Sequence, residues 1–272
     1  MKIAWATDIH LHFVKETRVA EFCSRVLESR AEALLIGGDI AEAIDLEEWL
    51  RFLDQHLERP IYFVLGNHDY YRGDISTVRN RMRGLKSRRL HWLPHTGLVR
   101  LTPSTALVGH GGWGDARLGE FLGSPVILND YLRIEDLRGS TQEKRLPDVH
   151  GNKERLQKRL GKLGDDAAAT LRPVLSEAAR DFSDVIVLTH VPPFREACWH
   201  EGKISDENWL PGFTCKAMGD MLLEVVSAHP NCNVRVLCGH THGSGEARIL
   251  PNLHVRTGGA EYGDPRFELL DL

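Results

Sequence analysis

The chain has 272 residues, of which 42% are hydrophobic and 26% are charged, a composition typical of a soluble globular protein. Its formal net charge of -4 excludes a global attraction to nucleic acid or to an anionic membrane, although a local basic patch is compatible with it. The sequence has no apolar run of about 18 residues and no signal-peptide pattern, which predicts a cytoplasmic protein without a membrane partner.

The first part of the chain alternates apolar runs with amphipathic segments. Apolar runs at residues 3–7, 33–36 and 61–65 predict buried strands. The segments between them predict two helices, the first capped by Thr17 and the second beginning near Asp45. This strand-helix order predicts parallel pairing with right-handed crossovers, so the carboxyl ends of the three strands should meet at one edge of a sheet.

The middle of the chain is less regular. An arginine-rich helix is predicted at residues 75–85, and its basic face is interpreted as solvated rather than as a phosphate-binding patch. Short strands follow between residues 90 and 108, and a glycine-rich loop covers residues 109–115. Residues 116–163 are crowded with charges, which predicts a small helical, cap-like insertion in a single domain of residues 1–272.

The remainder returns to alternating elements and ends in strands. Helices are expected near residues 165–178 and 218–226, and strands at 185–189 and 234–238. The last residues, from 247 to 270, predict an antiparallel meander that makes the second sheet mixed.

Polar side chains follow the predicted buried strands. The clearest example is the quartet Gly66-Asn67-His68-Asp69, which directly follows the run at residues 61–65. A solvated turn explains one such quartet, but repetition after five strands indicates a shared site, because open α/β sheets bind ligands at this edge. The residues concerned are Asp8, His10, Asp39, Asn67, His68, Asp69, His190, His240 and His242.

These side chains predict a metal centre. Carboxylate and imidazole ligands without thiolates suit Mn, Fe or Zn. The donors exceed what one ion needs, and two ions about 3.5–4 Å apart that share a carboxylate would use them all. Such a pair suits displacement at phosphorus.

The ordered motifs resemble those of the calcineurin-like metallophosphoesterases. They are Asp-x-His at Asp8, Gly-Gly-Asp at Asp39, Gly-Asn-His-Asp at 66–69, a lone His190, and Gly-His-x-His at 239–242, and they span most of the chain. The resemblance implies an α/β fold, a four-layer αββα sandwich of two mixed sheets. One departure is Glu42, three residues after Asp39, to which we assign no role here.

The resemblance also implies residue roles. Asp8, His10 and His242 would hold one cation, Asn67, His190 and His240 the other, and Asp39 would bridge them. The cofactors would be two divalent ions, with Mn favoured over Fe or Zn. His68 would stabilise the phosphate or protonate the leaving group while Asp69 orients its ring, and a metal-bridging hydroxide would attack phosphorus.

Three further residues are weaker candidates. His110 in the glycine-rich loop could line the substrate pocket or could serve packing. Arg72, just after the quartet, could contact a substrate phosphate. His12, two residues after His10, could support the site or lie on the surface.

We therefore predict a metal-dependent phosphoesterase, with a phosphodiester substrate favoured. Phosphomonoesterase and protein phosphatase activities are alternatives, and a catalytically silent scaffold that binds a protein partner is less favoured because the expected ligands are all present. The expected partner is a small phosphorylated substrate such as a nucleotide or a phosphodiester. Nucleic acid is not favoured, because the arginine clusters at residues 79–89 have no interleaved aromatic residues.

Overall fold

The apolar runs of the first half form a parallel sheet, as the strand-helix order predicts. In the computed structural model, which describes residues 1–138 and 153–272, this sheet has five strands in the order β13-β1-β2-β3-β4. Only β13 is antiparallel to its neighbour, β1. The strands are β1 (Lys2–Ala6), β2 (Ala33–Ile36), β3 (Ile61–Phe63), β4 (Leu90–Trp92) and β13 (Glu268–Asp271).

The second sheet is mixed and has six strands in the order β11-β12-β10-β7-β6-β5. Its four central strands are parallel, whereas β5 and β11 pair antiparallel at the two edges. A separate two-stranded hairpin, β8 (Trp199–His200) with β9 (Lys203–Ile204), lies in the loop after β7. The six strands are β5 (Val99–Arg100), β6 (Thr105–Gly109), β7 (Asp184–Leu188), β10 (Asn233–Cys238), β11 (Gly245–Leu250) and β12 (Leu253–Thr257).

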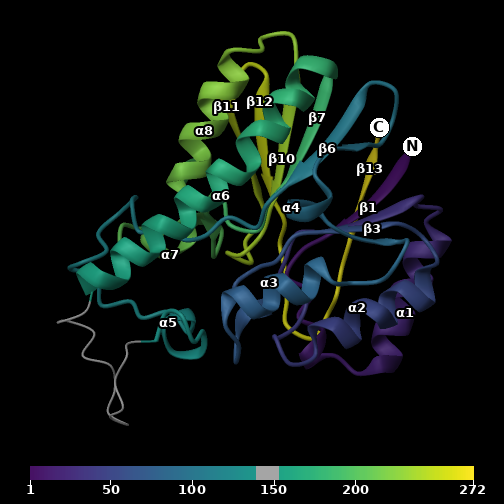
Figure 1. Cartoon of the computed structure of the whole chain (residues 1–272), viewed down its shortest axis with the longest axis horizontal. Coiled ribbons are helices and arrows are strands. Elements are labelled where there is room, and N and C mark those ends of the chain that lie inside the picture. Colours follow the sequence, from purple (N-terminus) through teal and green to yellow (C-terminus); the bar gives the residue numbers. More distant parts are fainter. Residues whose placement is uncertain (139–152) are drawn as a thin grey trace.

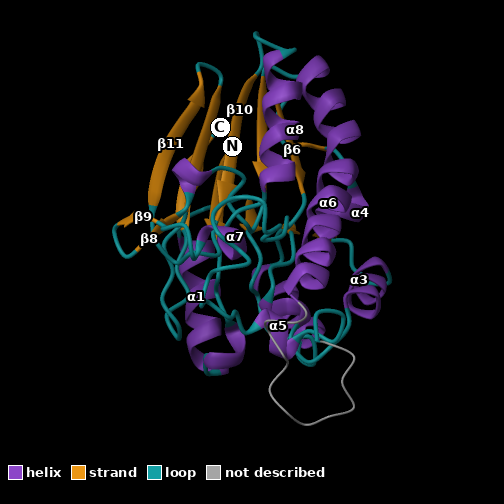
Figure 2. Ribbon diagram, turned by 90° about the vertical axis from the view of Figure 1, so that its left-hand side faces the viewer, coloured by secondary structure: helices purple, strands orange, loops and turns teal. Residues whose placement is uncertain are grey.

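Helices cover the outer faces of both sheets, which confirms the four-layer sandwich (Figure 1). The first sheet packs against α1 (Glu16–Glu28), α2 (Leu46–Leu57) and α3 (Ile75–Arg83). The second packs against α6 (Lys153–Asp181) and α8 (Lys216–Ser227), which lie side by side in Figure 2. Three helices of four residues each lie in connections: α4 (Leu93–Thr96), α5 (Asp130–Arg133) and α7 (Leu210–Phe213).

The two sheets pack through their inner faces. Trp5 and Leu35 of the first sheet, with Ile186, Leu188 and Leu237 of the second, form a buried apolar layer between them. This layer fixes the two sheets against each other, because close-packed side chains tolerate little displacement. The carboxyl ends of both sets of parallel strands therefore lie at a common edge. No helix within residues 1–138 and 153–272 is long and apolar enough to cross a membrane.

The structure differs from the sequence-based expectations in several elements. The helix expected near residue 165 begins at Lys153, so the end of the expected insertion at residues 116–163 is the first part of α6. Residues 139–152 of that insertion lie outside the described residues. The first helix begins at Glu16 with Lys15 as its N-cap, so Thr17 is not the cap.

The C-terminal strand also differs from expectation. It does not continue the meander of the second sheet; β13 pairs with β1, and the N-terminal amine donates to the carbonyl of Leu272 over 3.1 Å. The reason is hydrophobic packing: Leu270 is buried in the layer between the sheets together with Ile3.

Candidate metal centre

The strand-end residues converge at the common edge of the two sheets. Asp8, His10, Asp39, Asn67 and His190 are all at most 8% exposed. They follow β1, β2, β3 and β7, and two further histidines follow β10. The structure therefore brings together side chains that lie up to 234 residues apart in the sequence, from Asp8 to His242.

One group of donor atoms contains Asp8, His10 and His242. The Nε2 atoms of His10 and His242 are 3.1 Å apart, and Nε2 of His242 is 3.5 Å from Oδ1 of Asp8. One ligand atom from each of the three residues lies within 4.8 Å of the others. Such a spacing suits a cation between them.

A second group contains His190, His240 and Asn67. Nε2 of His190 is 3.2 Å from Nδ1 of His240 and 3.0 Å from Oδ1 of Asn67. The other ring nitrogen of each histidine donates to a backbone carbonyl: Nδ1 of His190 to Gly37 over 2.9 Å, and Nε2 of His240 to Gly212 over 3.0 Å. These hydrogen bonds fix the tautomers, so both converging nitrogens present lone pairs.

Asp39 lies between the two groups. Its Oδ1 is 3.4 Å from Nε2 of His190, and its Oδ2 is 3.8 Å from Nε2 of His10. Burial, and then the charge of Asp8, raises the pKa of the Asp39 carboxyl well above its usual range. Two neighbouring buried carboxylates are unfavourable unless cations compensate them.

The residues fit a binuclear metal centre. Three lone-pair acceptors meet at His190, His240 and Asn67 without a proton between them, an arrangement that is repulsive until a cation occupies it. Burial lowers the pKa of His10, His190 and His240 below the ordinary value, and a neutral imidazole is the form that binds metal. The donor set of carboxylate, imidazole and amide suits Mn, Fe or Zn.

Two glycines allow the loops to approach this closely. A Cβ atom on Gly66 would collide with the Asp39 carboxylate, and one on Gly239 would collide with that of Asp8. Close approach of backbone to the ligands therefore requires glycine at both positions.

His68 lies beside the metal centre rather than within either group. Its Nε2 is 3.9 Å from Oδ2 of Asp39, and its ring stacks on Tyr71 with centroids 4.2 Å apart. Burial lowers the pKa of His68 to about 3, so its ring is neutral over the working range.

Asp69 does not orient the His68 ring, contrary to the sequence-based expectation. Its carboxylate accepts hydrogen bonds from the backbone amides of Ile40 and Ala41, both over 2.9 Å, and from Gly66 over 2.8 Å. Asp69 therefore joins the loops after β2 and β3. A carboxylate suits this role because its two oxygens can accept several hydrogen bonds from backbone amides.

Two other predicted site residues, His110 and Arg72, make contacts within the protein. His110 is only 6% exposed, its Nδ1 accepts from the amide of Gly112 over 3.0 Å, and burial lowers its pKa to about 3. It therefore serves packing rather than lining a pocket. Arg72 forms an ion pair with the buried Glu42 over 2.9 Å, and Arg133 contacts the same carboxylate over 3.4 Å.

The sequence-based reasoning missed Asp130. It lies on α5 and is 5% exposed, and its Oδ1 accepts from Nδ2 of Asn67 over 2.8 Å and from the Tyr71 hydroxyl over 2.7 Å. No signal in the sequence distinguishes it, because it lies among many other charged residues and far from any strand end.

Exposed aromatic rings border the centre. Phe13 is 57% and Tyr262 is 55% exposed, and their rings meet edge to face at 5.3 Å. The Tyr262 ring lies 4.5 Å from that of His10 and 4.9 Å from that of His242. We call Phe13 and Tyr262 the aromatic rim. A hollow of about 420 Å³ lies beside His242.

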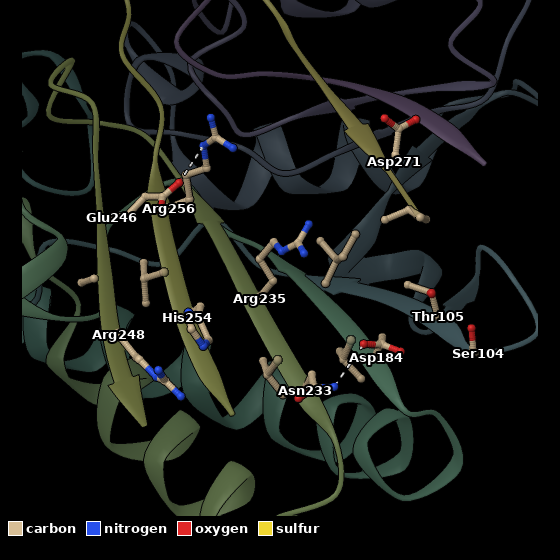
Figure 3. A pocket seen from close by; sticks show the side chains of 16 residues that line it. Ser104, Thr105, Asp184, Asn233, Arg235, Glu246, Arg248, His254, Arg256 and Asp271 are labelled. Atoms are coloured by element: carbon tan, nitrogen blue, oxygen red, sulfur yellow. Dashed lines mark hydrogen bonds and ion pairs between the residues drawn. The ribbon is translucent and has the colours of Figure 1, made fainter. Parts of the chain in front are cut away.

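A groove of about 860 Å³ crosses the second sheet (Figure 3). Its walls carry both charge signs, and Arg256 is paired with Glu246 over 3.7 Å. It is lined by the amino ends of β6, β7 and β10, by residues of β11 and β12, and by the C-terminal residues 271–272. None of the candidate metal ligands is among its lining residues.

Comparison with known proteins bears on the family and on the fold of the chain. The family model of the calcineurin-like phosphoesterases matches residues 1–244. No curated protein matches the sequence significantly. The structure of phosphopantetheinyl hydrolase from Mycobacterium tuberculosis is similar, with a TM-score of 0.64, 14% identity, and coverage of 98% of this chain and 95% of that chain.

A dimetal phosphatase from Danio rerio is also similar, with a TM-score of 0.56 and 12% identity over 95% of this chain and 87% of that chain. At these identities the two solved structures show a shared fold.

Proposed function

The chain belongs to the calcineurin-like phosphoesterase family and is a metal-dependent hydrolase of phosphoric esters, and from this premise we propose that its substrate is a small phosphodiester. The observation that carries the proposal is the buried carboxylate of Glu42, which pairs with both arginines beside the metal centre and leaves them one net positive charge. Monoesters and phosphoproteins are the alternatives.

We assign the ligands from the two donor groups. Asp8, His10 and His242 would hold one divalent cation, and Asn67, His190 and His240 the other. Asp39 would contact both, because its two oxygens face different groups. Mn²⁺ is the cation we favour over Fe or Zn, since carboxylate, amide and imidazole donors without thiolates suit it.

The cations, when bound, would lower the pKa of water toward neutrality and offset the charge on the phosphate. The protein's own side chains would orient the ester and stabilise its leaving group. Nε2 of His68 is directed to the same side as Asp39, where the neutral ring could donate a hydrogen bond to the phosphate or to the leaving oxygen. Tyr71 holds the imidazole in place by stacking.

The charges near His68 favour a diester. Arg72 lies three residues after the quartet, and the Arg133 guanidinium lies 5.5 Å from the centroid of the Tyr71 ring that stacks on His68. Both arginines are bound by Glu42. A monoester carries about one more negative charge than a diester near neutral pH, because a phosphomonoester has a second pKa near 6. The two arginines and Glu42 together keep one net positive charge, which matches the single negative charge of a diester better than the larger charge of a monoester.

The aromatic rim supports the same choice. Exposed apolar surface beside a polar centre is typical of a ligand-binding site. A diester has two organic substituents, and one of them can pack on Phe13 and Tyr262 while the other leaves. A nucleotide diester suits such rings because its base can stack on them.

A nucleic-acid polymer is not favoured. The arginines of α3 have partners within the protein: Arg79 donates to the Tyr70 hydroxyl over 3.3 Å, and Arg83 lies 5.6 Å from the Trp92 ring centroid. All five cysteines are free and buried, which supports a reducing compartment, and we propose the cytoplasm.

The test compares bis-(p-nitrophenyl) phosphate with p-nitrophenyl phosphate on Mn²⁺-loaded protein. We expect the ratio of the kcat/KM value for the diester to that for the monoester to be well above one. Asp39→Asn should abolish turnover of the diester. Glu42→Gln should free the arginines and lower this ratio about tenfold or more, since a hydrogen bond to a charged group is worth about 1.5–3 kcal/mol.

Glu48→Gln is the matched control, because it removes the same charge from an exposed position on α2. It should leave the ratio unchanged. A wild-type ratio below one would contradict the diester proposal, and so would turnover of neither ester by protein that binds two cations.

A further inference from the structure

Asp130 connects the insertion to the metal centre. Its Oδ1 accepts two hydrogen bonds, from Nδ2 of Asn67 over 2.8 Å and from the hydroxyl of Tyr71 over 2.7 Å. Nδ2 of Asn67 also lies 3.2 Å from the Tyr71 hydroxyl oxygen. The three side chains thus form a closed, buried network, with Asp130 at 5% and Asn67 at 8% exposure.

This network determines which end of the Asn67 amide faces the metal centre. An ionised carboxylate only accepts hydrogen bonds, so Asn67 must present its NH₂ group to Asp130. The amide oxygen is then directed toward Nε2 of His190, 3.0 Å away. Without Asp130 the amide could rotate by half a turn and donate to that lone pair, which would leave a donor where a cation needs an acceptor.

We propose that Asp130 is a positioning residue that fixes the Asn67 amide with its oxygen toward the second cation, so that the insertion completes the metal centre. The inference rests on the proposed role of Asn67 as a ligand. The inference assigns a role in metal binding to Asp130 of the insertion, which lies outside the strand-end motifs.

The segment that carries Asp130 is attached to the loop that follows Asn67. The amide of Arg72 donates to the carbonyl of Arg133 over 2.8 Å, and the amide of Glu135 donates to the carbonyl of Gly73 over 3.1 Å. Further along, Oδ2 of Asp136 accepts from the amide of Ile75 over 2.6 Å. The two backbone bonds hold Asp130 against Asn67 independently of any cation, and the Asp136 bond is an additional attachment further from Asp130.

The pairing also explains why a carboxylate suits this position. The Tyr71 hydroxyl and the Asn67 amide both need an acceptor in a buried place, where an unpaired polar group is costly. One carboxylate oxygen satisfies both donors. A hydrophobic residue at position 130 would leave both without this partner.

The first experiment needs no metal. In the metal-free protein, ¹H–¹⁵N NMR of the Asn67 side-chain NH₂ should show two distinct, slowly exchanging protons, assigned by their loss in Asn67→Ala. Asp130→Ala should shift these signals and speed their exchange with solvent at least about tenfold. Unchanged signals would overturn the inference.

The second experiment counts Mn²⁺ by calorimetric titration of metal-free protein. Asp130→Ala should weaken the second Mn²⁺ by about 10- to 100-fold, as is usual when a partner of a metal ligand is removed, and leave the first unchanged. Asp130→Asn should restore most of the affinity, because its amide oxygen can still accept from Asn67 and Tyr71. Equal losses in both variants would mean that the charge acts without positioning, which would overturn the inference.

Asp136→Ala is the matched control. It removes a carboxylate of the insertion that accepts a hydrogen bond from the Ile75 amide but does not contact Asn67. It should keep both Mn²⁺ affinities; a loss like that of Asp130→Ala would show a general effect of loosening the insertion and would refute positioning. If Asp130→Ala does not fold, Tyr71→Phe removes part of the same network and should weaken only the second Mn²⁺.

The two proposals fail separately. If the wild-type protein bound fewer than two Mn²⁺ ions, the binuclear site of the proposed function would be wrong, whereas the NMR signals of Asn67 would still decide whether Asp130 orients the amide.

Discussion

Asp69 should stabilise the metal-free fold rather than act in turnover. Its buried carboxylate accepts from the amides of Ile40, Ala41 and Gly66 over 2.8–2.9 Å. Asp69→Ala leaves three buried N–H groups without an acceptor, and each costs about 1–3 kcal/mol. Dehydration of the carboxylate in the wild-type protein offsets part of this cost, since burial raises the pKa of Asp69 to about 7. The three amides together amount to about 3–9 kcal/mol, and we therefore expect a loss in the lower half of that range, about 3–6 kcal/mol.

Urea unfolding of EDTA-treated protein at pH 8, followed by tryptophan fluorescence and circular dichroism, measures this loss. Asp69→Asn should lose less, about 1–3 kcal/mol, because its amide oxygen can still accept from Ile40 and Ala41 while only Gly66 loses its acceptor. An alanine variant within about 1 kcal/mol of wild type would refute the reasoning. If such a variant also lost turnover, the orientation of His68 by Asp69 would be the better account.

Three further predictions concern other parts of the chain. Asp74→Ala should destabilise the protein by about 1 kcal/mol at pH 7, because Asp74 caps α3 by accepting from the Thr77 amide over 2.8 Å. That bond lowers the pKa of Asp74 from 3.8 to about 2, so the contribution is present above pH 4 and is lost as pH falls through 2 in urea unfolding series. Burial raises the pKa of Cys215 and Cys238 to about 12, so a thiol reagent at pH 8 should label native protein slowly and all five cysteines only after denaturation. Removal of metal by EDTA should abolish turnover, and Mn²⁺ at about 100 times its Kd should raise the unfolding free energy by about 2.7 kcal/mol for each bound cation, measured as a shift of the urea midpoint.

The sequence predicts where the candidate ligands meet but not how each one is held. Asp8, Asp39 and Asn67 are predictable because each follows a buried run, and parallel strands end at one edge of a sheet. The succession of strands and helices along the chain follows from local patterns of apolar residues, so this level of the fold is accessible from sequence. The pairing of β13 with β1 is not, because it joins the two ends of the chain and no local pattern records the partner.

Roles that depend on a long-range partner were beyond sequence reasoning. The carboxylate of Asp69 has the chemistry to orient an imidazole, and only the positions of three backbone amides show that it does something else. Glu42 likewise acquires its role from Arg72 and Arg133, and the latter lies 91 residues away. Asp130 is one of many charged residues in its segment until the fold places it against Asn67.

The backbone of the centre shows why local preference alone could not predict its geometry. Most non-glycine residues avoid the left-handed region, at a cost of about 1–2 kcal/mol each. Backbone hydrogen bonds between the strand-end loops compensate for this strain: the amide of Asp8 donates to Gly38 over 3.0 Å, and that of His10 donates to Asp39 over 2.9 Å. Five of the candidate ligands adopt positive φ angles: Asp8 (52°), His10 (41°), Asp39 (51°), His240 (71°) and His242 (59°).

Strain of this kind persists where the surrounding structure determines it, and it is common at functional sites. Here the rigid layer between the sheets imposes the conformation, because Trp5 and Leu35 pack in it a few residues before Asp8 and Asp39. The donor atoms are therefore close together in the absence of a cation. The packing of the two sheets supplies the free energy that holds them in these strained conformations. Metal binding to such a centre should need little reorganisation of the chain, which is the physical reason that seven candidate ligands from five separate strand ends can act as one site.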